Sequence, residues 1–129
     1  MNKIIVEVSI GELLDKISIL EIKQEKIQDP EKLKFINNEH HILKIQLEKN
    51  IKTDEKLNSL YKSLKEINTK LWVIEDDKRQ CEKDKNFGES FIKLSRDVHF
   101  LNDDRAKIKL EINNHTGSSI KEIKEYTSY

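Results

Sequence analysis

The strongest constraint on the fold is one stripe of side chains between residues 91 and 112. Its seven members alternate at spacings of three and four residues: Phe91, Leu94, Val98, Leu101, Arg105, Ile108 and Ile112. This spacing is typical of one face of a long helix, and of the seam of a coiled coil. Every member except Arg105 is apolar, so a charged group is expected where hydrocarbon would otherwise pack. A buried arginine needs a partner or access to water.

Three earlier segments also carry apolar side chains at helical spacing, separated by short breaks. We expect helices over residues 10–27, 30–50 and 54–84, before a fourth helix over residues 89–112. Short connections favour two antiparallel hairpins, formed by the first two and the last two helices. The chain of 129 residues is therefore predicted to be one all-α domain, a bundle of four long helices. Each long helix would measure roughly 30 Å.

Both ends of the chain are expected to lie outside the helices. Residues 3–8 alternate apolar and other side chains, which predicts a short strand or an extended arm. Ser9 and Glu12 then form a capping box at the start of the first helix. Residues 113–118 are expected to form a loop. The tail, residues 118–129, is expected either to form one helical turn, started by a second capping box at Ser119 and Glu122, or to dock as an extended segment.

Composition excludes several classes of function. The 24 basic and 24 acidic residues cancel, and a neutral chain without a basic block is a poor candidate for nucleic-acid binding. No apolar run approaches the ~20 residues that span a bilayer, so we expect no membrane segment. A lone cysteine, Cys81, excludes an internal disulfide, and its charged neighbours indicate an exposed thiol. These features favour a cytoplasmic protein.

Polar side chains recur on three of the predicted helices and are the candidates for a site. Asn102 and Asp103 stand in mid-helix, although both are poor helix formers. Trp72 precedes a pair of carboxylates by one turn, and an indole supplies an apolar wall and an N–H donor. The alternative is a set of solvated faces with ion pairs such as Glu12–Lys16. The candidate ligand-binding residues are Glu12, Asp15, Lys16, Trp72, Glu75, Asp76, Asn102, Asp103, Arg105 and Lys109.

Three motifs along the chain are familiar. They are Val6-Glu7-Val8-Ser9-x-Gly11-Glu12-Leu13-x-Asp15-Lys16, Leu71-Trp72-x-Ile74-Glu75-Asp76 and Asn102-Asp103-x-Arg105-Ala106-x-Ile108-Lys109. With these motifs the chain resembles, over nearly its whole length, a family of small helical bacterial proteins of unknown function. The resemblance implies no activity, but it implies that the polar residues of the motifs form one site. The C-terminal stretch is looser than the family's tail, so we expect the tail to lie outside that site.

Two functions stay open. The first is a non-enzymatic binding or assembly protein, in which Arg105 and Lys109 bind an anionic small molecule and Asp15, Glu75 and Asp103 orient it. Long stripes with few aromatic residues also suit an antiparallel homodimer that completes the core.

The second function is a magnesium-dependent hydrolase of a nucleotide or sugar phosphate, acting through the same carboxylates. All-α nucleotide pyrophosphohydrolases hold magnesium with paired acidic motifs, but those motifs do not occur in order here. The chain has no nucleophile motif and no histidine spacing suited to zinc, so no catalytic residue, resident metal or cofactor is assigned.

Overall fold

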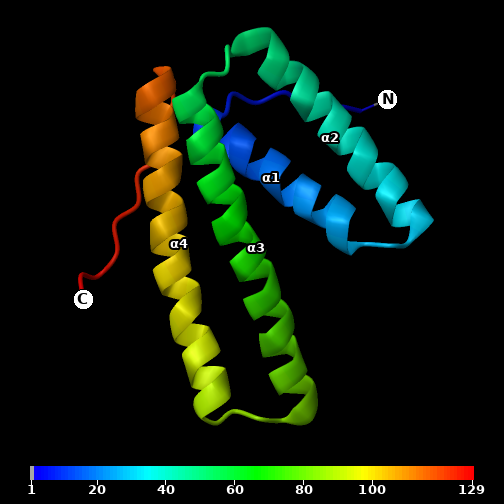
Figure 1. Ribbon diagram of the computed structural model, residues 1–129, viewed down its shortest axis with the longest axis vertical. Coiled ribbons are helices and arrows are strands. Elements are labelled where there is room, and N and C mark those ends of the chain that lie inside the picture. The colour runs from blue at the N-terminus through cyan, green and yellow to red at the C-terminus, as the bar shows by residue number, and fades with distance from the viewer. Residues whose placement is uncertain (1) are drawn as a thin grey trace.

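Four helices form the fold of residues 2–129, the part of the chain that the computed structural model describes. They are α1 (Ile10–Lys26), α2 (Pro30–Asn50), α3 (Glu55–Asp84) and α4 (Glu89–Thr116). Within residues 2–129 there is no strand. Figure 1 shows α1 and α2 as one antiparallel hairpin and α3 and α4 as a second, longer one. The prediction of an all-α bundle built from two hairpins is therefore confirmed.

Side-chain caps start three of the helices. Ser9, Asp29 and Asp54 accept hydrogen bonds from backbone N–H groups two or three residues later, at 3.1, 3.0 and 2.7 Å. Each bond satisfies a backbone donor that has no partner inside the helix. At the other end of the chain, Gly117 takes a left-handed conformation with φ 67° and ends α4. The helix boundaries thus follow local chemistry that can be read from the sequence.

Each end of the chain follows one of its two predicted alternatives. Residues 3–8 are an extended arm and not a strand, and the tail lies along α4 as an extended segment without a helical turn. The predicted loop over residues 113–118 is wrong, because α4 continues to Thr116. Asn113 is a poor helix former, but its side chain accepts a hydrogen bond from the backbone N–H of Gly11 at 2.7 Å. This contact with α1 outweighs the local propensity of Asn113.

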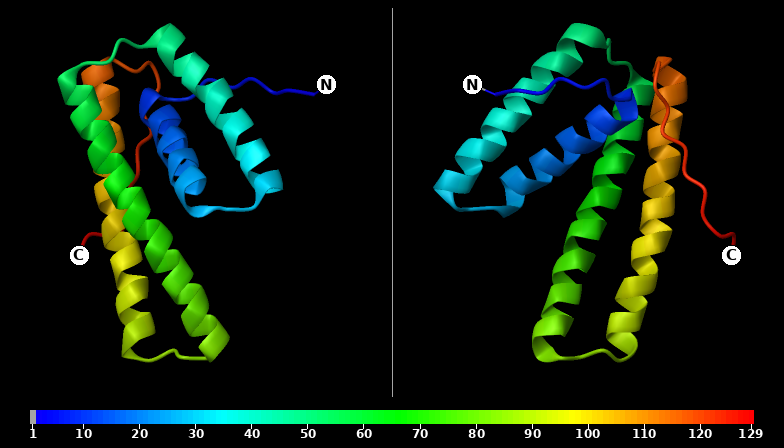
Figure 2. Two further views of the ribbon diagram at one scale, coloured as in Figure 1. Left: turned by 45° about the vertical axis from the view of Figure 1, so that its right-hand side comes forward. Right: turned by 180° about the vertical axis from the view of Figure 1, so that it is seen from behind.

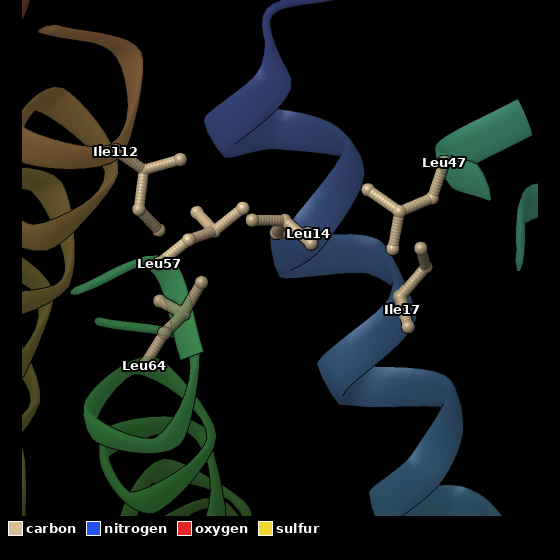
Figure 3. Close-up of a cluster of buried hydrophobic side chains, with 6 residues drawn as sticks. All are labelled: Leu14, Ile17, Leu47, Leu57, Leu64 and Ile112. Atoms are coloured by element: carbon tan, nitrogen blue, oxygen red, sulfur yellow. The ribbon is translucent and has the colours of Figure 1, made fainter. Parts of the chain in front are cut away.

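Helix α1 holds the bundle together because it packs against each of the other three helices. The two views in Figure 2 show α2 on the outer side of α1 and away from α4. One apolar cluster fills the crossing of the helices, with side chains that point toward one another in Figure 3. Its buried members are Leu14, Ile17, Leu47, Leu57, Leu64 and Ile112. The core therefore lies where α1 crosses the α3–α4 hairpin.

The α3–α4 hairpin extends well beyond α1 and α2 (Figure 1). In this distal half, seam residues such as Phe91, Leu94 and Val98 are only half-buried. Cys81 is an exception, because it is buried and not exposed as its charged neighbours suggested. Lys78 follows Ile74 by four residues and Cys81 follows Lys78 by three, so the three side chains share one face of α3. The charged neighbours of Cys81 in sequence lie on other faces of the helix.

Gly11 marks the closest approach of α1 to α4. A Cβ atom at Gly11 would lie 2.6 Å from the carbonyl oxygen of Lys109 and 2.9 Å from Oδ1 of Asn113. The first of these neighbours is backbone and cannot rotate away. Glycine is therefore required here by the packing of two helices.

We predict that Gly11→Ala destabilises the protein by about 2 kcal/mol, because α1 must move away from α4. Urea unfolding monitored by circular dichroism measures this change. Gly88→Ala is the control, since a Cβ atom there would meet only Asn86 Oδ1, at 3.4 Å. Equal stabilities of the two variants would contradict the prediction.

Candidate functional site

The carboxylate of Asp15 is the most deeply buried charge in the core, with 1% of the residue exposed. It faces α4, where Arg105 Nε donates to Oδ1 at 3.0 Å and Arg105 Nη2 donates to Oδ2. From α3, Asn68 Nδ2 donates to Oδ1 at 2.8 Å. Burial alone would raise the pKa of Asp15, but the hydrogen bonds from Arg105 and Asn68 outweigh it and hold the pKa below its ordinary value. Asp15 is thus an ionised group shared by three helices.

Arg105 connects this buried carboxylate with the solvent. Its side chain is 28% exposed, while that of Asp15 is 2% exposed. Hydrogen bonding to Asp15 is the main cause that raises the pKa of Arg105 above its ordinary value. A guanidinium carries five N–H donors, and Arg105 uses two on Asp15 and one, through Nη1, on Asn102 Oδ1 at 3.4 Å. Two N–H donors are left over on the partly exposed guanidinium.

Lys109 lies one turn further along α4, and its ammonium group is close to three carboxylates. Its Nζ donates to Glu12 Oε2 at 2.7 Å and lies 3.4 Å from Asp15 Oδ2 and 3.6 Å from Glu122 Oε2. Burial lowers the pKa of Lys109, but the carboxylates outweigh it and the net pKa is raised. Lys16, at the exposed edge, lies 3.9 Å from Glu12 in the ion pair expected at this spacing. The ammonium of Lys109 is therefore fixed as a cation.

The first backbone amides of α1 all have partners within the chain. Glu12 N–H donates to Ser9 Oγ, Ile10 N–H to Ser118 Oγ at 3.1 Å, and Gly11 N–H to Asn113. The Glu12 carboxylate binds Lys109, so only the Ser9 half of the predicted capping box forms. The ion pair with a buried lysine competes successfully with a local backbone bond.

The other predicted residues are distributed differently. Asp103 accepts a hydrogen bond from the hydroxyl of Tyr129, at the end of the tail. Glu75 and Asp76 are exposed on α3, Trp72 is half-buried, and none of the three forms a polar contact with another described side chain. The structure therefore brings together Glu12, Asp15, Asn102, Arg105 and Lys109, and leaves the α3 candidates outside this cluster.

The tail forms one wall of a groove of about 830 Å³ along α4. Contrary to expectation, the tail lies beside the clustered residues, and it is held at both ends. Ser118 binds the start of α1, and the Tyr129 ring packs against His99 and Phe100 at 5.4 Å between ring centroids. The groove is lined by Glu12, Asn102, Asp103, Arg105, Ala106, Lys107, Lys109, Leu110, Asn113, Glu122, Ile123, Lys124, Tyr126, Thr127, Ser128 and Tyr129.

Sequence reasoning missed the partners that complete this network. Asn68 is 5% exposed and donates through Nδ2 to Asp15 and also to Ser18 Oγ, both at 2.8 Å. Asn68 follows Leu64 by four residues, so it stands inside the apolar stripe of α3, which is the signal that could have identified it. Glu122 had no such signal, because its contact with Lys109 depends on the path of an irregular segment.

The arrangement of acidic groups bears on metal binding and on membranes. Among residues 2–129, no group of three or more histidine, cysteine, aspartate or glutamate side chains is placed to hold a metal ion. Asp15, one of the carboxylates of the hydrolase hypothesis, is bound by Arg105 and lies 3.4 Å from Lys109 Nζ. No helix in the described part of the chain is long and apolar enough to cross a membrane.

We predict that Arg105→Met destabilises the protein by about 3 kcal/mol, because it leaves the buried Asp15 carboxylate without its main partner. Chemical unfolding at neutral pH measures this loss. Arg79→Met, on the exposed surface of α3, is the matched control and should change stability by less than about 0.5 kcal/mol. A loss below about 1 kcal/mol for Arg105→Met would show that the pair does not hold the helices together.

Comparisons with known proteins agree with the resemblance seen in the sequence. No curated protein and no solved structure matches the chain. The model of a family of unknown function, DUF6165, matches residues 4–129. This match spans all four helices and the tail, and thus every residue of the groove. The chain therefore belongs to the family of unknown function DUF6165.

Proposed function

We propose that this protein binds an anionic small molecule in the groove between α4 and the tail, without catalysing a reaction. The observation that carries the proposal is the convergence of four cationic side chains on one groove of about 830 Å³. Such a volume lies within the range of about 300–1,000 Å³ that is common for small-molecule sites. The cationic side chains are Arg105, Lys107, Lys109 and Lys124.

The buried network supports this proposal because it orients the cations in advance. Asp15 holds the guanidinium of Arg105 through two hydrogen bonds, so its two remaining N–H donors are fixed in direction. Lys109 is held in the same way by Glu12. A cation that is already ordered loses little side-chain entropy when an anion binds. Amide side chains of Asn102 and Asn113 add polar groups to the same wall.

The hydrolase alternative has no supporting observation in the described residues. Its carboxylates neutralise cations, and the α3 pair Glu75 and Asp76 lies outside the groove. Binding is therefore the better-supported function, and the groove is its proposed place.

A thermal-shift screen tests this proposal. We expect at least one class of anion in a panel of phosphate, citrate, nucleotides and carboxylates to raise Tm at millimolar concentration and constant ionic strength. An anion at about 100 times its Kd stabilises a protein by about 2.7 kcal/mol. The double variant Lys107→Ala/Lys124→Ala removes two exposed cations of the groove and should reduce the shift.

Lys70→Ala/Lys121→Ala is the matched control. It removes the same charge from exposed positions on α3 and the tail that do not line the groove. We expect it to keep the wild-type shift. Equal shifts in the two double variants, or no shift with any anion, would contradict the proposal.

Self-association is a second candidate, favoured by the uncovered distal half of the α3–α4 hairpin. Val73, Phe87 and Ile92 are 45, 52 and 54% exposed there, beside a half-buried seam. If the α3–α4 hairpin of a second copy packed antiparallel on this one, the two hairpins would form a four-helix bundle and cover the half-buried apolar side chains.

Sedimentation velocity at several concentrations tests this second candidate. We expect a concentration-dependent dimer that Ile92→Glu weakens. Ile42→Glu, on α2, is the control because Ile42 has a similar exposure of 51%. A monomer at all concentrations, or equal effects of the two substitutions, would exclude this interface.

A further inference from the structure

We infer that the ligand of the groove carries a single carboxylate on an apolar body, and that the carboxylate of Glu122 occupies the place of that group in the structure. This inference rests on the proposed function and specifies its ligand. It is carried by the charges around Lys109 and by the apolar side chains of the tail.

The charges favour one negative group over several. Lys109 and Arg105 face three carboxylates, those of Glu12, Asp15 and Glu122. Lys16 lies 3.9 Å from Glu12, and Lys124 lies 3.3 Å from Glu122, so the cluster has about as many positive as negative groups. Replacing Glu122 by one carboxylate keeps this balance. A polyphosphate or tricarboxylate would place additional negative charge beside Glu12 and Asp103.

Glu122 is the member of the cluster that can leave. Its oxygen lies 3.6 Å from Lys109 Nζ, against 2.7 Å for that of Glu12, and its side chain is 43% exposed. An exposed ion pair of this kind contributes little to stability. Removing it would leave the four cations of the cluster with two carboxylates, those of Glu12 and Asp15, and would open Lys109 to the groove. Ser118 and Tyr129 would still attach the tail on either side.

The tail supplies an apolar surface next to this charged point. Ile123, Tyr126 and Tyr129 line the groove, yet they are 74, 73 and 78% exposed. Leu110 and Ala106 lie on the facing wall of α4. Exposed apolar side chains that border a concave site are typical of a ligand surface. An apolar body placed between these walls would cover them.

The spacing of two tail contacts within the groove suggests the size of that body. Lys109 Nζ lies 3.6 Å from Glu122 Oε2, and Asp103 accepts a hydrogen bond from Tyr129. These two residues of α4 are six positions apart, or about 9 Å along the helix axis. A phenyl ring on a short alkyl chain has this length, so 4-phenylbutyrate is a suitable probe.

The experiment compares four compounds by isothermal titration calorimetry at constant ionic strength. They are 4-phenylbutyrate, its uncharged amide, acetate and citrate. We expect measurable binding of 4-phenylbutyrate and much weaker binding of the other three. Each comparison tests one feature, namely the charge, the apolar body and the preference for a single carboxylate.

Two tail variants test the role of Glu122. Glu122→Gln should bind 4-phenylbutyrate about threefold more tightly, because the competing carboxylate is removed. Glu125→Gln loses the same charge from an exposed tail position that does not line the groove, and should bind as the wild type does. Magnetisation transfer between the phenyl protons and the Tyr126 and Tyr129 rings would place the probe.

The outcomes separate this inference from the function on which it rests. If citrate or phosphate binds through Lys107 and Lys124 while 4-phenylbutyrate does not, the anion site stands and the ligand class is wrong. Equal binding by the two glutamine variants would overturn the role of Glu122. If no compound and no anion binds wild type or variants, both proposals fall.

Discussion

Burial of the Asp15 carboxylate against Arg105 is the interaction on which the geometry of this bundle depends. A charge taken out of water is costly unless a partner and hydrogen bonds replace its hydration. Asp15 obtains its partners only when α1 lies against both α3 and α4, since Asn68 and Arg105 come from different helices. A bundle with apolar residues at positions 15 and 105 can be equally stable, so we interpret the ion pair as the contact that selects one arrangement of α1.

The same face of α1 carries the other contacts that require one register. Gly11, Asp15 and Ser18 follow at spacings of four and three, and all three lie against α3 or α4. Further along α1, Glu21 accepts a hydrogen bond from Tyr61 of α3, and its Oε2 lies 3.0 Å from Nε2 of His40 on α2. Polar contacts therefore position α1 against each of its neighbours, while the small apolar core supplies the burial.

The helices could be predicted from the sequence because their signals are local. Apolar spacing and capping residues such as Asp29 and Asp54 act within a few positions of the chain. The sequence also predicts that Arg105 has an acidic partner, because an arginine inside an apolar stripe requires an acceptor. Its identity as Asp15, and not Glu75 or Asp103, depends on how α1 crosses α4 and becomes visible only in the structure.

The path of the tail could not be predicted from local sequence signals. Residues 118–129 have no periodic pattern, and their path is set by contacts with residues far away in the chain, such as Ser118 with Ile10. The groove and the place of Glu122 follow from that path. Likewise, Asn113 belongs to α4 and not to the predicted loop, and the residue that its side chain binds, Gly11, lies 102 positions earlier.

Asp15 stays ionised inside the bundle because Arg105 faces it. The most direct test is a pH titration of the Asp15 side-chain carboxyl carbon by NMR. A pKa held below 3.8 in the folded protein means that the pair stabilises the fold above that pH and loses its effect as the pH falls through the lowered pKa. We predict that the Asp15 signal keeps its ionised position at pH values where exposed aspartates are already protonated. Titration at or above the ordinary pKa would contradict the account.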